Sequence, residues 1–243
     1  MFDKRVTVFM GHYGSGKTFV SVNYALALAK LGKIVSIYDL DIVNPYFRTV
    51  DAKKRLSEGG VELVVSPFAQ TNVDIPAMNA KSYQMIDDKS RYAVADIGGD
   101  DRGALALGRF AGKIKEENNY DALLVLNKFR PETRDINGAL EIINEIERTG
   151  KLPFTGIVNN ANLGNETTAD DIISGFQFAE ELSKITGLPI KFTAVIMITA
   201  IVQRLKSPDS SGLNFFKSSA INDAVSAAAA AFNISSITGG TVF

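Results

Sequence analysis

The 243-residue sequence predicts an α/β fold, a three-layer α/β/α sandwich in which helices cover both faces of a mostly parallel sheet. Short apolar, β-branched runs recur along the chain and alternate with longer stretches that have the apolar spacing of helices. The runs are apolar at nearly every position, which is typical of parallel strands buried on both faces. No internal repeat or low-complexity linker divides the chain, so residues 1–243 are expected to form a single domain.

The elements follow in order from these patterns. Strands are predicted over residues 5–10, 33–41, 61–66, 92–99, 121–127, 154–160 and 190–198. Helices are predicted over residues 20–30, 131–148, 167–185 and 219–232. In the second of these helices, Pro131 and Glu132 suit a first turn. Strands that alternate with helices form right-handed βαβ units, which give a parallel sheet.

The composition excludes several classes of protein. The chain has no cysteine, which rules out a disulfide, a thiolate zinc site and a cysteine-ligated iron–sulfur cluster within one chain. The net charge is −1 and no long basic run occurs, so nucleic-acid binding is not indicated. No 18-residue apolar span and no signal-peptide pattern occur. We therefore expect a cytoplasmic protein without a membrane anchor.

The segment "GHYGSGKT", residues 11–18, joins the first predicted strand to the first predicted helix and matches the pattern G-x-x-x-x-G-K-[ST]. Glycines let the backbone curl so that successive N–H groups face phosphate oxygens, and the helix N-terminus adds its positive dipole end. The expected phosphate-contacting residues are Gly11, Gly14, Ser15, Gly16, Lys17 and Thr18. Lys17 reaches β- and γ-phosphates, and the Thr18 hydroxyl is a ligand for Mg²⁺.

Acidic residues end two later strands. Asp39 and Asp41 end the strand in "IYDLDIVNP", at the edge where parallel sheets bind ligands. Asp96 ends the apolar run of "YAVADIGG" in the manner of a Walker B aspartate, and Gly99 completes a D-x-x-G pattern that can sense a γ-phosphate. We predict that Asp39, Asp41 and Asp96 hold Mg²⁺ or its water, and that Asp41 orients the attacking water.

The base-binding residues are less defined. "LVLNKFR" has Arg130 where the guanine-binding N-K-x-D pattern needs an aspartate, which argues against GTP. Asn159 and Asn160 end the strand in "TGIVNNANLG", and an asparagine amide offers both a donor and an acceptor to the edge of adenine. The same asparagines also suit an ordinary turn. Both interpretations stay open.

The series "GHYGSGKT", "YDLDIVNP", "AVADIGGD" and "GIVNNAN" resembles the ParA/MinD-type P-loop ATPases over roughly residues 4–165. These belong to the SIMIBI branch, which also contains the nitrogenase iron protein, and the chain is similar to a poorly characterised ATP-binding subgroup. The resemblance implies ATP and Mg²⁺ as ligands, and many relatives form ATP-dependent dimers. It assigns the phosphate lysine to Lys17 and the Mg²⁺ hydroxyl to Thr18. The aspartate near the attacking water is assigned to Asp41, with Asp39 two residues before it. The Walker B and γ-sensing positions are assigned to Asp96 and Gly99, and the adenine-contacting asparagine to Asn160.

The chain departs from this family pattern at His12, which stands where relatives carry a second, "signature" lysine. A histidine is shorter than lysine and mostly neutral near pH 7, so lysine-dependent activation of a partner subunit is not expected. The side chain either substitutes weakly near the phosphates or points to solvent, and we favour solvent. The C-terminal segment also lacks the basic amphipathic tail of the membrane-binding relatives.

Three functions fit these residues. The favoured one is a weak or partner-activated ATPase that acts as a nucleotide-dependent switch for a protein partner of unknown identity. The second is an ATP-using small-molecule enzyme of the dethiobiotin-synthetase or cobyrinate-amidase type, with residues 67–83 lining an acceptor pocket. The third is an ATP-bound adaptor that does not hydrolyse its nucleotide.

Overall fold

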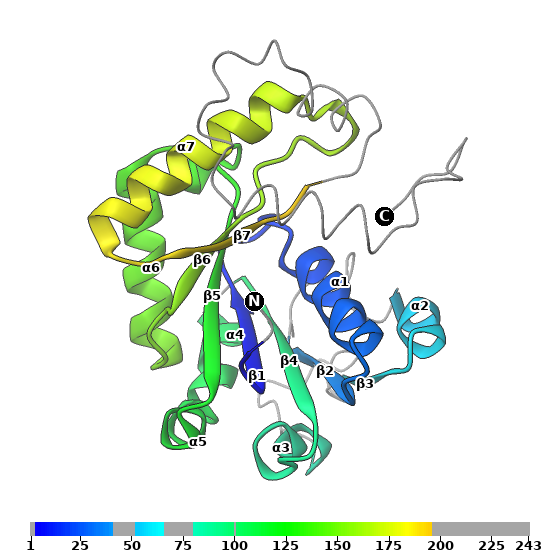
Figure 1. Cartoon of the computed structure of the whole chain (residues 1–243). Helices are drawn as coiled ribbons and strands as arrows, with labels where there is room; N and C mark the ends of the chain where they lie inside the picture. Colours follow the sequence, from blue (N-terminus) through cyan, green and yellow to red (C-terminus); the bar gives the residue numbers. More distant parts are fainter. Residues whose placement is uncertain (1–2, 41–51, 66–79, 100, 196–243) are drawn as a thin grey trace, which may run out of the picture.

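The computed structural model describes residues 3–40, 52–65, 80–99 and 101–195, which form an α/β fold around a central sheet (Figure 1). Within these residues the sheet has seven strands in the order β3-β2-β4-β1-β5-β6-β7. Every strand pairing is parallel. The predicted fold class is confirmed, and each of the seven predicted apolar runs contains a strand.

The described elements have the following bounds. The strands are β1 (Val6–Met10), β2 (Val35–Leu40), β3 (Val61–Val65), β4 (Tyr92–Ile97), β5 (Tyr120–Leu126), β6 (Gly156–Asn159) and β7 (Ile190–Thr193). The helices are α1 (Lys17–Lys30), α2 (Lys53–Glu58), α3 (Ala80–Asp87), α4 (Asp101–Gly108), α5 (Ala111–Glu117), α6 (Ile136–Gly150) and α7 (Ala169–Thr186), with short 3-10 helices η3 (Pro131–Thr133) and η4 (Gly164–Glu166). No described helix has the length and apolar character needed to cross a bilayer.

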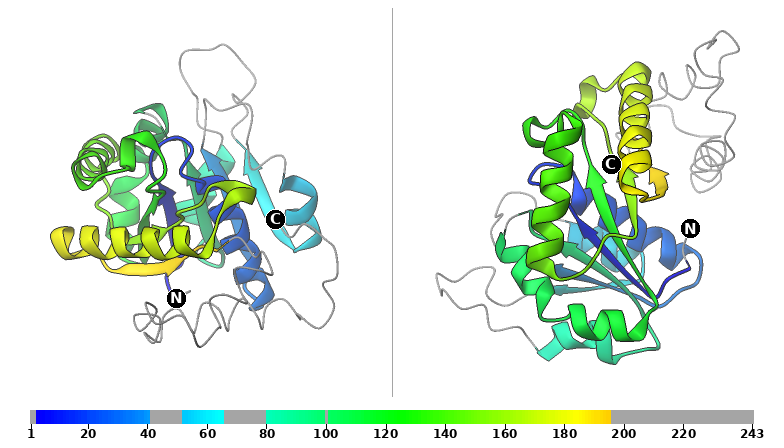
Figure 2. Two further views of the ribbon diagram at one scale, coloured as in Figure 1. Left: turned by 90° about the horizontal axis from the view of Figure 1, so that it is seen from above. Right: turned by 90° about the vertical axis from the view of Figure 1, so that its left-hand side faces the viewer.

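Alternate residues of each strand face two separate cores. Phe9, Ile37 and Val94 pack with α1 and α2 on one face. Val8 and Ala95 pack with helices α3 to α7 on the other face. Figures 1 and 2 show α1 and α6 on opposite sides of the sheet, as a three-layer sandwich requires. The near-complete burial of β1, β2 and β4 explains why their sequences are mostly apolar on both faces.

Two helix boundaries depend on capping residues. Asp135 is the N-cap of α6, where its backbone is extended and its side chain accepts a hydrogen bond from the N–H of Gly138. The prediction that this helix begins at Pro131 is therefore wrong, because η3 is a separate turn that ends before the cap. Thr168 caps α7 in a reciprocal capping box, one residue after the predicted start. The predicted helix over residues 219–232 lies outside the described residues.

The strand order places β1 at the point where the chain reverses direction across the sheet. β1 pairs with β4 on one side and β5 on the other. The chain runs first to β2 and β3, returns to β4, and then continues on the far side to β5, β6 and β7. Ligands of open parallel sheets bind at the carboxyl ends of the strands beside such a switch point. The topology therefore predicts that a functional site lies at the loop after β1.

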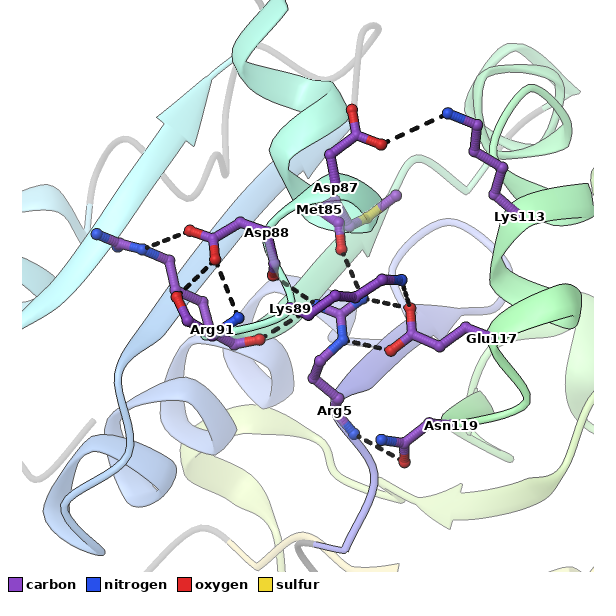
Figure 3. Close-up of polar contacts among 10 residues, drawn as sticks. Arg5, Met85, Asp87, Asp88, Lys89, Arg91, Lys113, Glu117 and Asn119 are labelled. Carbon is purple, nitrogen blue, oxygen red and sulfur yellow. Dashed lines mark hydrogen bonds and ion pairs between the residues drawn. The ribbon is translucent and has the colours of Figure 1, made fainter.

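An ionic network surrounds Arg5 at the other end of the strands, just before β1 begins (Figure 3). The Arg5 guanidinium pairs with Glu117 at the end of α5 and donates to the carbonyls of Met85, Asp88 and Arg91. Lys89 also pairs with Glu117. Hydrogen bonding from Arg5 outweighs the effect of burial and holds the pKa of Glu117 below its usual range. The network joins α3, α5 and the start of β1, far from the loop after β1.

The lowered pKa of Glu117 predicts a stability that depends on pH. A carboxyl whose pKa is lower in the folded state stabilises the fold above its unfolded pKa and loses that contribution as pH falls through the folded pKa. Glu117→Gln should therefore reduce the free energy of unfolding by about 1–3 kcal/mol at pH 7. The difference from wild type should vanish in strong acid. Urea unfolding from pH 7 down to pH 3 measures this, with the exposed neighbour Glu116→Gln as the control, and a difference that is constant with pH would contradict it.

Candidate nucleotide site

Residues 11–18 form a curled P-loop between β1 and α1. Gly16 is the N-cap of α1 at φ 89°, a left-handed conformation that a side chain disfavours. No side chain caps this helix end, and no acidic residue lies in its first turn. Within the described residues, the buried hydroxyl of Ser15 also has no hydrogen-bond partner. An N-terminal helix end of this kind, with a buried hydroxyl beside it, suits a bound phosphate.

Side chains from inside and outside the loop hold its carbonyl groups. Lys17 is buried, and its Nζ donates to the carbonyl of His12 at 3.0 Å. The buried amide of Asn160, after β6, donates through Nδ2 to the carbonyl of Ser15 at 2.6 Å. Because a trans peptide points its C=O and the next N–H in opposite directions, Asn160 turns the N–H of Gly16 away from itself. The loop is thus shaped before any ligand arrives.

Gly99, after β4, lies against the P-loop from the other side. A Cβ atom added at Gly99 would stand 2.6 Å from the backbone nitrogen of Tyr13 and 2.8 Å from Nζ of Lys17. Only a glycine fits in this space. The D-x-x-G segment therefore lies beside the lysine that is predicted to bind the terminal phosphates.

Asp39 and Asp96 are direct register partners across β2 and β4. Both are buried, with 3% and 1% of their surface exposed. The alternation along each strand places them on the sheet face covered by α1, whose first turn carries Thr18. Two carboxylates and a hydroxyl are hard oxygen donors that fit Mg²⁺. The described residues hold no cluster of three or more His, Asp or Glu that could bind a metal without further ligands. A Mg²⁺ ion here would complete its shell with phosphate and water oxygens.

The remaining predicted site residues are Asp41 and Asn159. Asp41, the predicted water-orienting residue, lies outside the described residues. Asn159 is buried; its Nδ2 donates to the Thr193 hydroxyl at 3.5 Å, and its Oδ1 accepts from the N–H of Ala161. The structure thus brings together the P-loop, Asp39, Asp96, Gly99 and Asn160, whereas the side chain of Asn159 joins β6 to β7.

His12 does not point into open solvent, contrary to our prediction. Its Nδ1 lies 3.5 Å from Oε2 of Glu132 in η3, and 27% of its side chain is exposed. His12 and Gly99 also line a small cavity between α4 and α6, with a volume of about 20 Å³. That volume suffices for about one water molecule. The structure therefore places the histidine ring against η3.

Sequence reasoning missed the contacts that the segment before α6 makes with the P-loop. Arg130 donates through Nε to the carbonyl of Gly14 at 2.7 Å, and Glu132 faces His12 as described above. In the sequence, Arg130 served only as an argument against guanine, and Glu132 was predicted to lie in a helix. The turn residue Pro131 between them is the signal that could have marked this segment as a loop lying on the P-loop.

A parallel sheet with a P-loop after its central strand and paired aspartates on the neighbouring strands defines a P-loop nucleotide-binding protein. The chain belongs to the CobQ/CobB/MinD/ParA nucleotide binding domain family, whose model matches residues 6–168.

The individual proteins that this chain resembles share less than 30% of its residues. An uncharacterised ATP-binding protein of Methanocaldococcus jannaschii is 27% identical over 187 residues, which cover 67% of this chain and 66% of that protein. The cell division protein FtsY of Thermotoga maritima is 19% identical with a TM-score of 0.54, covering 78% of this chain and 61% of that one. The signal recognition particle 54 kDa protein of Aeropyrum pernix is 16% identical with a TM-score of 0.52, covering 79% and 41%. The chain thus spans less than two thirds of each relative, and the solved structures support the fold alone.

Proposed function

We propose that the protein binds ATP with Mg²⁺ in the P-loop and acts as a weak or partner-activated ATPase whose nucleotide state is recognised by a protein partner. The observation that carries the proposal is the meeting of three groups at one strand edge: Lys17 in the P-loop, Gly99 beside it, and the register pair of Asp39 with Asp96. The relative from Methanocaldococcus jannaschii is described as ATP-binding, which supports ATP as the nucleotide. The proposal treats residues 1–243 as one cytoplasmic domain.

Each group has a defined task in this proposal. Lys17 and the loop N–H groups would bind the phosphates and offset the charge that develops on them. Thr18, Asp39 and Asp96 would hold Mg²⁺, which when bound neutralises the β- and γ-phosphate oxygens. Asp41 would orient the attacking water. Gly99, which the structure places against Lys17, would sense the γ-phosphate and pass the nucleotide state to its loop.

The position of His12 bears on how hydrolysis is triggered. In the resemblance to ParA/MinD ATPases, a lysine at this position reaches the phosphates of a partner subunit. Here the histidine ring faces Glu132 of the same chain. We therefore propose that, in a nucleotide-dependent homodimer of this chain, the separate protein partner and not residue 12 triggers ATP hydrolysis. Most of the segment predicted to line an acceptor pocket, residues 67–83, lies outside the described residues, and no observation on the described ones favours the small-molecule enzyme.

Phosphate release by the purified protein tests this function. Wild type should release phosphate from ATP slowly, and chelation of Mg²⁺ should stop it. Asp41→Ala should lower the rate about a hundredfold, because it removes the group that orients water, while ATP binding persists. Asp170→Ala, an exposed aspartate of α7, is the control. Phosphate release that is unchanged in Asp41→Ala would favour the adaptor, and release that rises with an added carboxylate substrate would favour the small-molecule enzyme.

A further inference from the structure

Arg130 combines a fixed position on the P-loop with an exposed guanidinium. Its Nε donates to the carbonyl of Gly14 at 2.7 Å. A Cβ atom added at Gly14 would stand 3.3 Å from Nε and 3.4 Å from the guanidinium carbon, so the guanidinium lies over this glycine. The side chain is nevertheless exposed. It therefore presents a planar cation to any ligand that crosses the P-loop at this point.

The arrangement of the site gives the direction of a bound nucleotide. Lys17 of a P-loop binds the β- and γ-phosphates. It lies beside Gly99, which follows β4, and β4 carries Asp96. The terminal phosphates therefore belong on the β4 side of β1. The sugar and base must leave on the opposite side, over the ends of β5 and β6, where Arg130 is located.

The two asparagines expected to contact the base are engaged in the fold. Asn160 holds the carbonyl of Ser15, and Asn159 contacts Thr193 and the N–H of Ala161. Both side chains are almost fully buried, at 3% and 1% exposed. Their amides act as structural groups that shape the P-loop and join β6 to β7. The Nδ2 groups of both amides are thus committed to the fold, and neither side chain offers an exposed surface to the face of a base.

We propose that the guanidinium of Arg130 stacks on the nucleobase while its Nε remains on the carbonyl of Gly14. This inference rests on the proposed nucleotide-binding function. Arginine guanidinium planes stack on nucleobases because they are flat, delocalised and weakly hydrated. The hydrogen bond to Gly14 holds the plane in place before the ligand binds, so little side-chain freedom is lost on binding. Stacking uses the face of the base and leaves its hydrogen-bonding edge for other groups.

Calorimetric titration with Mg²⁺–ATP and with Mg²⁺–tripolyphosphate tests this role, because tripolyphosphate has the phosphates but no base. Arg130→Met should weaken ATP binding about tenfold, the size expected for one stacked base, and leave tripolyphosphate binding within about twofold of wild type. Arg130→Tyr, which restores a flat ring without charge, should bind ATP more tightly than Arg130→Met. Arg134→Met is the matched control, since Arg134 lies in the same segment and its ion pair is with Asp135 at 3.9 Å.

The outcomes separate this inference from the proposed function. Wild type that binds neither ATP nor tripolyphosphate would overturn the function itself. Wild type that binds both, together with an Arg130→Met variant that binds ATP equally well, would overturn the stacking role alone. An equal loss of ATP and tripolyphosphate in Arg130→Met would also overturn it, because Arg130 would then act only on the P-loop or the phosphates. Should Arg130→Met fail to fold, the ratio of ATP to tripolyphosphate affinity in Arg130→Tyr and Arg130→Lys decides, with the higher ratio expected for tyrosine.

Discussion

Lys17→Ala should abolish measurable binding of Mg²⁺–ATP. The Lys17 ammonium is buried at the start of α1, and Nζ already donates to the P-loop through the carbonyl of His12. A charge-assisted hydrogen bond to each of two phosphates is worth about 1.5 kcal/mol or more, so their joint loss corresponds to about a hundredfold or more in affinity. Isothermal titration calorimetry measures the affinity directly.

The fold should survive this substitution. The apo protein loses the hydrogen bond to the His12 carbonyl, a cost of about 1 kcal/mol, which thermal unfolding will register as a small shift. Lys30→Ala is the matched control, because Lys30 is an exposed lysine in the last turn of the same helix. It should retain full ATP affinity. Retained binding in Lys17→Ala would remove the P-loop assignment and every role proposed from it.

The strands could be predicted from sequence because burial on both faces leaves a simple signal. β1, β2 and β4 are mostly apolar, and their few polar residues do not hide the pattern of a buried strand. The helices were harder to predict from the sequence. α2 and α5 are six and seven residues long, too short for a helical periodicity to stand out. The start of α6 depends on the side chain of Asp135 accepting a hydrogen bond from Gly138, a local choice that competes with helix formation from Pro131.

The phosphate side of the site could be predicted for a related reason. Its motif is contiguous, and the aspartates stand at strand ends that parallel topology brings to one edge. The nucleoside side could not be predicted in the same way. Asn160 has the chemistry of a base-contacting residue, but the contact of its Nδ2 with the Ser15 carbonyl spans 145 residues of sequence and has no sequence signal. Arg130 was recognised only for the aspartate that it replaces, because its contact with Gly14 spans 116 residues of sequence.

Gly99→Ala should weaken Mg²⁺–ATP binding markedly, although Gly99 lies outside the P-loop sequence. The new Cβ would stand 2.6 Å and 2.9 Å from the backbone nitrogen and Cα of Tyr13, and 2.8 Å from Nζ of Lys17. Lys17 could move at modest cost, but the P-loop backbone would have to shift with it. Overpacking of this kind typically costs about 1–3 kcal/mol, which corresponds to about fivefold to more than a hundredfold in affinity if the strain falls on the nucleotide-binding geometry.

A glycine in open surroundings provides the comparison. Gly112 lies in α5, and a Cβ there meets nothing within 4 Å. Gly112→Ala should leave ATP affinity unchanged and raise the stability slightly, by up to about 1 kcal/mol, because alanine is the better helix residue. Calorimetry and thermal unfolding on both variants separate a binding defect from a folding defect. If Gly99→Ala binds ATP within twofold of wild type, the loop after β4 does not take part in phosphate binding, and its proposed role as the sensor of nucleotide state fails with it.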